Sequence, residues 1–116
     1  MKLFSSKIFR QVAIPYWILC FVFTHLPPSA ALPEAAGLDK VLHFSGYSLL
    51  SFLLFSRVQF KTFPILMIYS LFDEGTQPYF RRDFEWGDLL ADNLGVLLGI
   101  TLGWWSLIAK KIFPDE

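Results

Sequence analysis

The stretch DLLADNLGVLLGITLGWWSLI, residues 88–108, decides the fold that this chain predicts. It is apolar over most of its length, but polar residues gather in its first two turns, at Asp88, Asp92 and Asn93. Polar and apolar residues do not alternate with a period of two, which argues against a β-strand. An α-helix needs about 20 mainly apolar residues to cross a hydrocarbon layer of about 30 Å. The stretch therefore predicts a transmembrane helix with a polar beginning.

The composition of the whole chain also indicates a membrane protein. Of its 116 residues, 54% are hydrophobic and only 17% are charged, whereas a soluble domain carries about 25% charged residues. The 13 phenylalanines and four tryptophans suit lipid and its interfaces. Ten acidic and ten basic residues give a net charge of zero, so we expect no nucleic-acid partner. The length predicts a single domain, residues 1–116.

Three further apolar runs precede residues 88–108, and proline or polar residues separate them. We predict an all-α membrane protein, namely a bundle of four transmembrane helices. The helices are expected at about residues 10–26, 39–56, 62–78 and 88–108. Each apolar core is slightly shorter than about 20 residues, and flanking aromatic and polar residues extend it.

The basic residues indicate how this bundle sits in the membrane. Seven of the ten fall on the side of the two termini: Lys2, Lys7, Arg10, Arg57, Lys61, Lys110 and Lys111. Basic loops are enriched on the cytoplasmic side of membrane proteins. We therefore expect a multi-pass protein of the inner cell membrane with both termini in the cytoplasm.

The first run has an alternative interpretation as a cleavable secretory signal peptide. A basic start, an apolar stretch and the small residues 29–31 are typical of such a peptide. Tyr16, Trp17 and the Pro27-Pro28 pair favour a retained helix instead, and cleavage would leave an odd number of spans. We therefore predict that this helix stays part of the protein.

The predicted topology brings three polar clusters to one depth, near the outer surface of the membrane. At 1.5 Å per residue, His43, Asp73 or Glu74, and Asp92 each lie about 6 Å inside an outer helix end. A charged group at membrane depth costs at least about 2.5–3.5 kcal/mol on insertion scales, so it usually has a partner or a task. The clusters therefore predict a polar pocket that opens to the outer leaflet.

These clusters contain candidates for both chemistry and binding. Adjacent carboxylates cannot both ionise freely in a low dielectric, which suits one of them to acid–base chemistry. The candidate catalytic residues are His43, Asp73, Glu74 and Asp92. The candidate substrate-binding residues are Asp39, Lys40, Tyr47, Gln77, Arg81, Arg82, Asp88 and Asn93. Two residues are expected at the rim of the pocket, Thr24 and His25.

Two other interpretations of the same residues stay open at this point. The polar groups could instead form a structural network that holds the helices together. Imidazole and carboxylate groups are also metal ligands by type. The chain has no H-E-x-x-H motif, however, and its two histidines lie on different predicted helices. We therefore expect neither a metal nor another cofactor.

A stripe of small residues follows the polar start of the last run, at Gly95, Gly99 and Gly103. Glycines spaced four residues apart on a transmembrane helix let a neighbouring helix approach closely. We expect this stripe to pack against another helix within the bundle. A homo-oligomer that forms through the stripe is the alternative.

Taken together, the polar motifs resemble those of the VanZ-like family. They are D-K-x-x-H-F-x-x-Y at residues 39–47, D-E-x-x-Q at 73–77, an arginine in the next loop, and the acidic motif at 88–99. The similarity covers roughly residues 10–108. It implies a small multi-pass bacterial membrane protein whose founding member is associated with resistance to the glycopeptide teicoplanin.

The expected function is to bind or process an anionic envelope lipid or lipid-linked precursor, with membrane lipids as partners. The sequence lacks a G-x-S-x-G nucleophile motif, so the question of catalysis stays open. The first alternative is a non-catalytic membrane interaction protein whose polar network is structural. A proton-coupled carrier is less favoured, because four short helices without a repeat leave little room for alternating access.

Overall fold

The computed structural model describes residues 6–26, 37–80 and 84–112, and the regular structure within them is entirely helical. The prediction of an all-helical protein is therefore confirmed. The α-helices are α1 (Ser6–Thr24), α3 (Leu38–Val58), α4 (Thr62–Thr76) and α5 (Trp86–Ile112). Two short 3-10 helices follow α3 and α4, namely η2 (Gln59–Lys61) and η3 (Gln77–Phe80).

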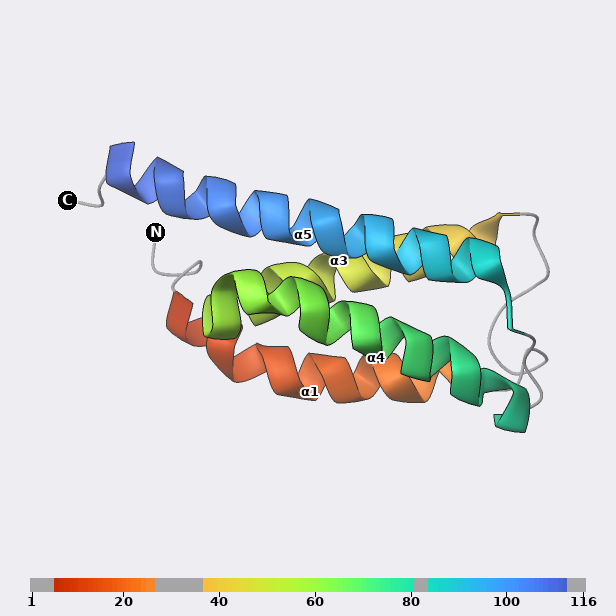
Figure 1. Cartoon of the computed structure of the whole chain (residues 1–116). Coiled ribbons are helices and arrows are strands. Elements are labelled where there is room, and N and C mark those ends of the chain that lie inside the picture. Colours follow the sequence, from red (N-terminus) through yellow and green to blue (C-terminus); the bar gives the residue numbers. More distant parts are fainter. Residues whose placement is uncertain (1–5, 27–36, 81–83, 113–116) are drawn as a thin grey trace.

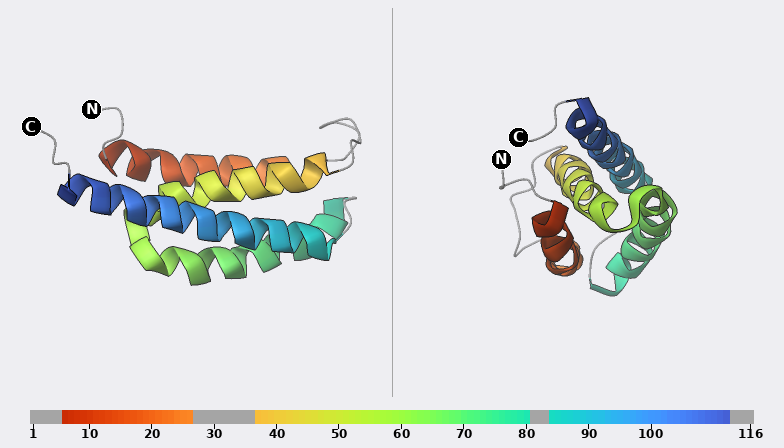
Figure 2. Two further views of the ribbon diagram at one scale, coloured as in Figure 1. Left: turned by 90° about the horizontal axis from the view of Figure 1, so that it is seen from above. Right: turned by 90° about the vertical axis from the view of Figure 1, so that its left-hand side faces the viewer.

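The α-helices run alternately up and down along one long axis, as Figures 1 and 2 show. α3 is the central helix and contacts α1, α4 and α5. α1 and α4 finish at the end of the bundle where α3 and α5 begin (Figure 1). We call this end the polar end. The opposite end, the basic end, carries Lys7, Arg10, Arg57, Lys61 and Lys110.

The outer surface of the bundle is strongly apolar. Ile18, Ile68 and Trp105 keep 62%, 67% and 66% of their surface exposed, and large exposed apolar surfaces suit lipid better than water. Within the described residues, three segments are long and apolar enough to cross a membrane: Lys7–Thr24, Leu38–Tyr79 and Trp86–Lys110. The chain therefore has the helices of a membrane protein.

The observed helix bounds differ from those expected by a few residues. α5 reaches Ile112 instead of residue 108, and α1 begins at Ser6 instead of residue 10. Hydropathy marks only the apolar core of a span, whereas helical hydrogen bonding continues through its polar and aromatic flanks. α4 has 15 residues, about 22 Å at 1.5 Å per residue. This is shorter than a full crossing, so four separate spans stay a prediction.

The glycine stripe of α5 packs directly against α3. A Cβ atom on Gly95 would lie 2.5 Å from the carbonyl oxygen of Phe44, and one on Gly99 would lie 2.7 Å from the backbone nitrogen of Phe52. Beside the stripe, the Ser51 hydroxyl donates a hydrogen bond of 2.7 Å to the Val96 carbonyl. The two backbones therefore lie close together over several turns, and a homo-oligomer that used this stripe would have to displace α3.

Candidate functional site

A group of buried polar side chains occupies the polar end of the bundle. Its members come from α1, α3, α4 and α5 and from the residues that directly follow α1 and α4: Thr24, His25, His43, Tyr47, Asp73, Glu74, Gln77, Asp88 and Asp92. We call these residues the polar cluster. Most of them are buried among the helices, which is an unusual place for ionisable groups because an apolar environment disfavours charge. The structure brings His43, Asp73, Glu74 and Asp92 to the same end of the bundle, and their depth in a membrane stays a prediction.

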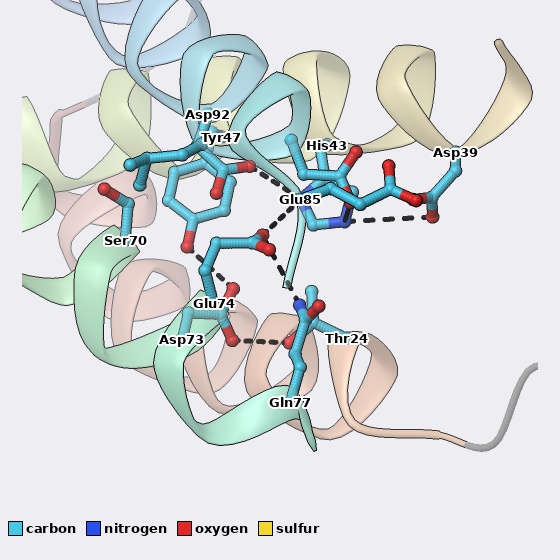
Figure 3. Close-up of polar contacts among 12 residues, drawn as sticks. Thr24, Asp39, His43, Tyr47, Ser70, Asp73, Glu74, Gln77, Glu85 and Asp92 are labelled. Carbon is cyan, nitrogen blue, oxygen red and sulfur yellow. Dashed lines mark hydrogen bonds and ion pairs between the residues drawn. The ribbon is translucent and has the colours of Figure 1, made fainter. Parts of the chain in front are cut away.

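His43 lies at the centre of the cluster, where α3, α4 and α5 meet. Its Nδ1 atom lies 2.7 Å from Asp92 Oδ1 and 3.4 Å from Glu74 Oε1. Its Nε2 atom faces outward, 3.8 Å from Asp39 Oδ1 and 3.9 Å from Asp88 Oδ2. Figure 3 shows His43, Glu74 and Asp92 pointing toward one another. The imidazole therefore connects a buried carboxylate pair with a second pair nearer the surface.

Asp73 forms a separate branch of the cluster that connects α4 to α1 and α3. The Tyr47 hydroxyl donates a hydrogen bond of 2.8 Å to Asp73 Oδ2, and the Thr24 hydroxyl donates one of 2.7 Å to Asp73 Oδ1 (Figure 3). His25 Nδ1 lies 3.5 Å from the same Oδ1 atom. Both carboxylate oxygens of Asp73 thus have partners. Their hydrogen bonds hold α4 against α1 and α3.

The structure places His25 inside the bundle, whereas the sequence suggested a residue at the rim. Only 6% of its surface is exposed. Its Nε2 atom lies 2.7 Å from the Thr76 hydroxyl, and its ring stacks on Phe21 with a centroid distance of 4.2 Å. His25 follows the last residue of α1, where the chain turns inward. Sequence periodicity could not reveal this position because periodicity ends with the helix.

Several buried oxygen atoms of the cluster lack hydrogen-bond donors among the described residues, namely Glu74 Oε2, Asp92 Oδ2 and Gln77 Oε1, and so does Asn93 Oδ1 beside the cluster. The Gln77 amide donates a long hydrogen bond of 3.5 Å to Glu74 Oε1. This bond does not satisfy Oε2, the other oxygen of the same carboxylate. A buried polar atom without a partner costs about 1–3 kcal/mol. A site that carries several such atoms is suited to a ligand that supplies donors or positive charge.

The candidates nearest the end of the bundle form a partly exposed ion-pair group. Lys40 Nζ lies 2.8 Å from Glu85 Oε2 and 3.4 Å from Asp88 Oδ1. The side chains of Lys40 and Glu85 are about half exposed, and Asp88 is buried. Asp39 also keeps 45% of its side chain exposed. These residues form the outer edge of the polar cluster.

Two sets of predicted binding residues do not join the cluster in the described structure. Asn93 lies on α5, and its amide donates to the Leu89 carbonyl at 2.8 Å and to the Ser70 hydroxyl at 3.3 Å. It therefore contacts α4 beside the cluster rather than His43. Arg81 and Arg82 lie outside the described residues, so their predicted role in binding phosphate stays a prediction.

The charges of the cluster are unbalanced. The described residues include four buried carboxylates and two buried imidazoles: Asp73, Glu74, Asp88, Asp92, His25 and His43. If all four carboxylates were ionised and both imidazoles were protonated, these groups would carry a net charge of −2. The half-exposed Lys40 reaches only the outer edge of the cluster and does not balance this charge. Unpaired charge is costly in an apolar interior. The cluster is therefore suited to hold protons, a cation, or a ligand that donates hydrogen bonds.

An apolar groove lies on the flank of the bundle, between α1 and α4. It has a volume of about 250 Å³ and is lined by Ile14, Trp17, Ile18, Phe21 and Tyr69. Trp17 and Tyr69 meet across it edge to face, with a centroid distance of 5.2 Å. Phe21 also stacks on His25, which contacts Asp73 of the polar cluster. The groove therefore leads along the apolar surface toward the cluster.

Comparisons with known proteins identify the family. The sequence matches the family model described as VanZ/LLP1 over residues 3–109, which confirms the resemblance suggested by the polar motifs. A search of the curated proteins gave no match, and neither did a search of the solved structures.

Proposed function

Because the chain belongs to the VanZ/LLP1 family, we propose that it is a multi-pass inner-membrane protein that binds or processes an envelope lipid or lipid-linked precursor. The binding site is the polar cluster, and the lipid chain occupies the groove between α1 and α4. The observation that carries this proposal is the set of buried oxygen atoms that receive no hydrogen bond from the described part of the chain, close to an apolar groove. A lipid with hydroxyl or amine groups in its head would supply both the missing donors and an apolar tail.

The orientation that we propose follows from the two ends of the bundle. The basic end faces the cytoplasm, as the positive-inside rule favours, and the polar end faces the outer leaflet. This arrangement requires four crossings and places both termini inside the cell. The polar cluster then lies where the head group of an outer-leaflet lipid resides.

An anionic head group needs positive charge near this acidic cluster. Lys40 lies at its outer edge and exchanges one of its carboxylate partners, Glu85 or Asp88, for a phosphate. Arg81 and Arg82 follow α4 in the sequence and serve as further phosphate ligands in this proposal, because guanidinium groups pair well with phosphate. In this proposal, basic side chains at the outer edge of the cluster bind the phosphate, and the buried acceptor oxygens within the cluster bind the donors of the head group.

The geometry around His43 also suits proton transfer. Its Nδ1 atom lies within hydrogen-bond distance of Asp92 Oδ1, and a carboxylate that orients an imidazole is a common arrangement in general acid–base catalysis. In a catalytic version of the proposal, His43 and Asp92 move a proton to or from the bound head group. A binding protein would use the same pair only for recognition.

Native mass spectrometry of the full chain in detergent tests this proposal. We expect a co-purified lipid, or capture of added phosphatidylglycerol or polyprenyl phosphate, by the wild type. Glu74→Gln should weaken retention about tenfold, which corresponds to about 1.4 kcal/mol. The matched control is Glu85→Gln, which makes the same chemical change on a half-exposed carboxylate. It should not weaken retention, because it removes a group that competes with the phosphate for Lys40. Equal lipid retention by both variants, or none by the wild type, would contradict the proposal.

A structural role for the cluster is the second candidate, and the Asp73 branch favours it. Tyr47 and Thr24 bind the two oxygens of Asp73 and so join α3, α4 and α1. If stability were the purpose of the whole cluster, Glu74→Gln and Asp73→Asn would both reduce the yield of folded protein. Under the lipid proposal only Asp73→Asn does so.

A contribution to teicoplanin resistance is the physiological consequence that we propose. Expression of the wild-type chain in a teicoplanin-sensitive bacterium should raise the inhibitory concentration of the drug. Glu74→Gln should accumulate in the membrane to the same level without this effect. An unchanged inhibitory concentration with the wild type would remove this consequence but leave lipid binding to the mass spectrometry experiment.

A further inference from the structure

We propose that His43, Glu74 and Asp92 form a binding site for one divalent transition-metal cation, of the Mn²⁺ or Zn²⁺ type. Each ligand comes from a different helix, α3, α4 and α5 respectively. The site lies within the polar cluster but does not depend on lipid binding, so the two proposals can fail separately.

The three ligand atoms have suitable spacing. His43 Nδ1, a Glu74 oxygen and an Asp92 oxygen all lie within 4.8 Å of one another. The nearest separations are 2.7 Å from Nδ1 to Asp92 Oδ1 and 3.4 Å from Nδ1 to Glu74 Oε1. Ligands about 2.1 Å from a tetrahedral metal are about 3.4 Å apart. Small side-chain shifts therefore suffice to admit an ion.

Unpartnered oxygens provide the second observation. Glu74 Oε2, Asp92 Oδ2 and Gln77 Oε1 are buried and receive no hydrogen bond from any residue that the structure describes. Glu74, Asp92 and Gln77 have no exposed surface at all. In Figure 3 the side chains of Glu74 and Gln77 meet, with Gln77 Nε2 placed 3.5 Å from Glu74 Oε1. Rotation of the amide exchanges its nitrogen and oxygen and would offer Oε1 as a fourth ligand.

The charges favour a divalent ion over a single proton. Glu74 and Asp92 together carry a charge of −2 when ionised, and a neutral His43 adds none. A divalent cation balances this charge completely, whereas protonation of His43 leaves one negative charge in an apolar interior. Lys40 pairs with Glu85 and Asp88, so it gives no direct compensation to the inner pair.

Two outer carboxylates lie beside the second nitrogen of the imidazole. Asp39, His43 and Asp88 also converge, but Asp39 is partly exposed and Asp88 already contacts Lys40. A metal-bound histidine usually donates its second ring N–H to a carboxylate. His43 Nε2 faces Asp39 Oδ1 and Asp88 Oδ2 at 3.8 and 3.9 Å. Both distances are longer than a hydrogen bond, so one of these carboxylates has to move closer to support the bound ligand. We therefore assign only the inner group to the ion.

The mixed ligand set determines the class of ion. One imidazole nitrogen with carboxylate and amide oxygens suits Mn²⁺, Zn²⁺ or Fe²⁺ better than Ca²⁺ or Mg²⁺, which prefer oxygen alone. From the sequence alone we expect no metal, because the ligands do not form a local motif. They are separated by 31 and 18 positions in the chain, and only the packing of three helices brings them together.

The test is equilibrium dialysis of the full chain in detergent, after removal of metals with EDTA, against Zn²⁺ and in parallel against Mn²⁺. We expect one bound ion per wild-type chain. Glu74→Gln and Asp92→Asn should each bind at least about tenfold more weakly, as loss of metal-site groups typically costs about 10–100-fold. The control Glu85→Gln should bind like the wild type. Circular dichroism verifies that every variant is folded.

Two results would overturn the metal proposal. One is the absence of stoichiometric binding of either ion by folded wild-type protein, and the other is equal affinity in the wild type and Glu74→Gln. If the variants do not fold, the proposal is tested with the wild-type protein alone, by its Co²⁺ complex. This complex must show visible absorption bands that disappear with EDTA, and their absence counts against the site. Lipid retention that persists without metal binding would leave the proposed function intact.

Discussion

The two halves of the contact between α3 and α5 are built on opposite principles. Toward the basic end, Gly99 and Gly103 lie against α3 with no room for a methyl group, and the neighbouring core consists of residues such as Leu50 and Leu54. Toward the polar end, the same two helices present His43 and Asp92 to each other. The apolar half gains stability by close packing, while the polar half buries charge at a cost. Because the polar half lowers stability while the apolar half raises it, the polar half indicates a task other than stability.

The largest expected effect comes from breaking the apolar half with Gly99→Ala. The new Cβ would meet backbone atoms of α3, including the nitrogen of Phe52 at 2.7 Å, so neither helix can yield without separating from the other. We expect a loss of about 3 kcal/mol in the free energy of unfolding, at the upper end of overpacking effects. Reversible unfolding in detergent measures it.

Gly75 provides the matched control for this change. It lies on α4, and a Cβ there would have no atom within 4 Å. Gly75→Ala should therefore be neutral or add up to about 1 kcal/mol through helix propensity. Equal losses in both variants would show that the close contact of α3 and α5 does not stabilise the fold.

A smaller effect is expected from Tyr47→Phe in the polar half. The change removes the hydroxyl that donates to Asp73 Oδ2 and leaves a buried carboxylate oxygen without its partner. We expect a loss of about 1–2 kcal/mol, within the range for unsatisfied buried groups. Tyr79→Phe, at a residue with 84% exposure, should leave the melting temperature unchanged. An unaltered melting temperature for Tyr47→Phe would argue that Asp73 does not connect the helices.

The smallest effect is expected at the outer edge of the polar half, for Lys40→Ala. Lys40 and Glu85 form an ion pair of 2.8 Å between side chains that are about half exposed. Solvent-exposed pairs contribute about 0.2–1 kcal/mol, and salt should reduce this value further. Thermal unfolding at low and high salt measures both. A loss above that of Tyr47→Phe would place the edge among the main stabilising contacts.

Much of this comparison could be predicted from the sequence, because it depends on single helices. Asp39 and His43 are four residues apart, which puts them on one face of a helix, and the G-x-x-x-G spacing predicts the close-packing stripe. The pairing between helices could not be predicted. Asp92 and Asn93 are adjacent in the sequence, but the orientation of α5 about its own axis directs Asp92 to His43 and Asn93 to Ser70.

The contributions of α1 show a second limit of sequence reasoning. Thr24 and His25 lie at the end of an apolar run and were expected only at the rim of the pocket, yet both contact Asp73. Such contacts depend on how α1 packs against α3 and α4, and no local pattern encodes that packing. The sequence therefore indicated that Thr24 and His25 lie near the other polar groups, but not that they contact Asp73.

The most direct test of the central claim is the melting temperature of Glu74→Gln relative to the wild type, both in detergent and stripped of lipid and metal. Glu74→Gln keeps the shape of the side chain and replaces a buried ionisable carboxyl group with a neutral amide. If the polar half exists for a ligand, the variant should melt at the same temperature as the wild type or higher. A melting temperature clearly below that of the wild type would contradict this account and assign Glu74 to the stability of the fold.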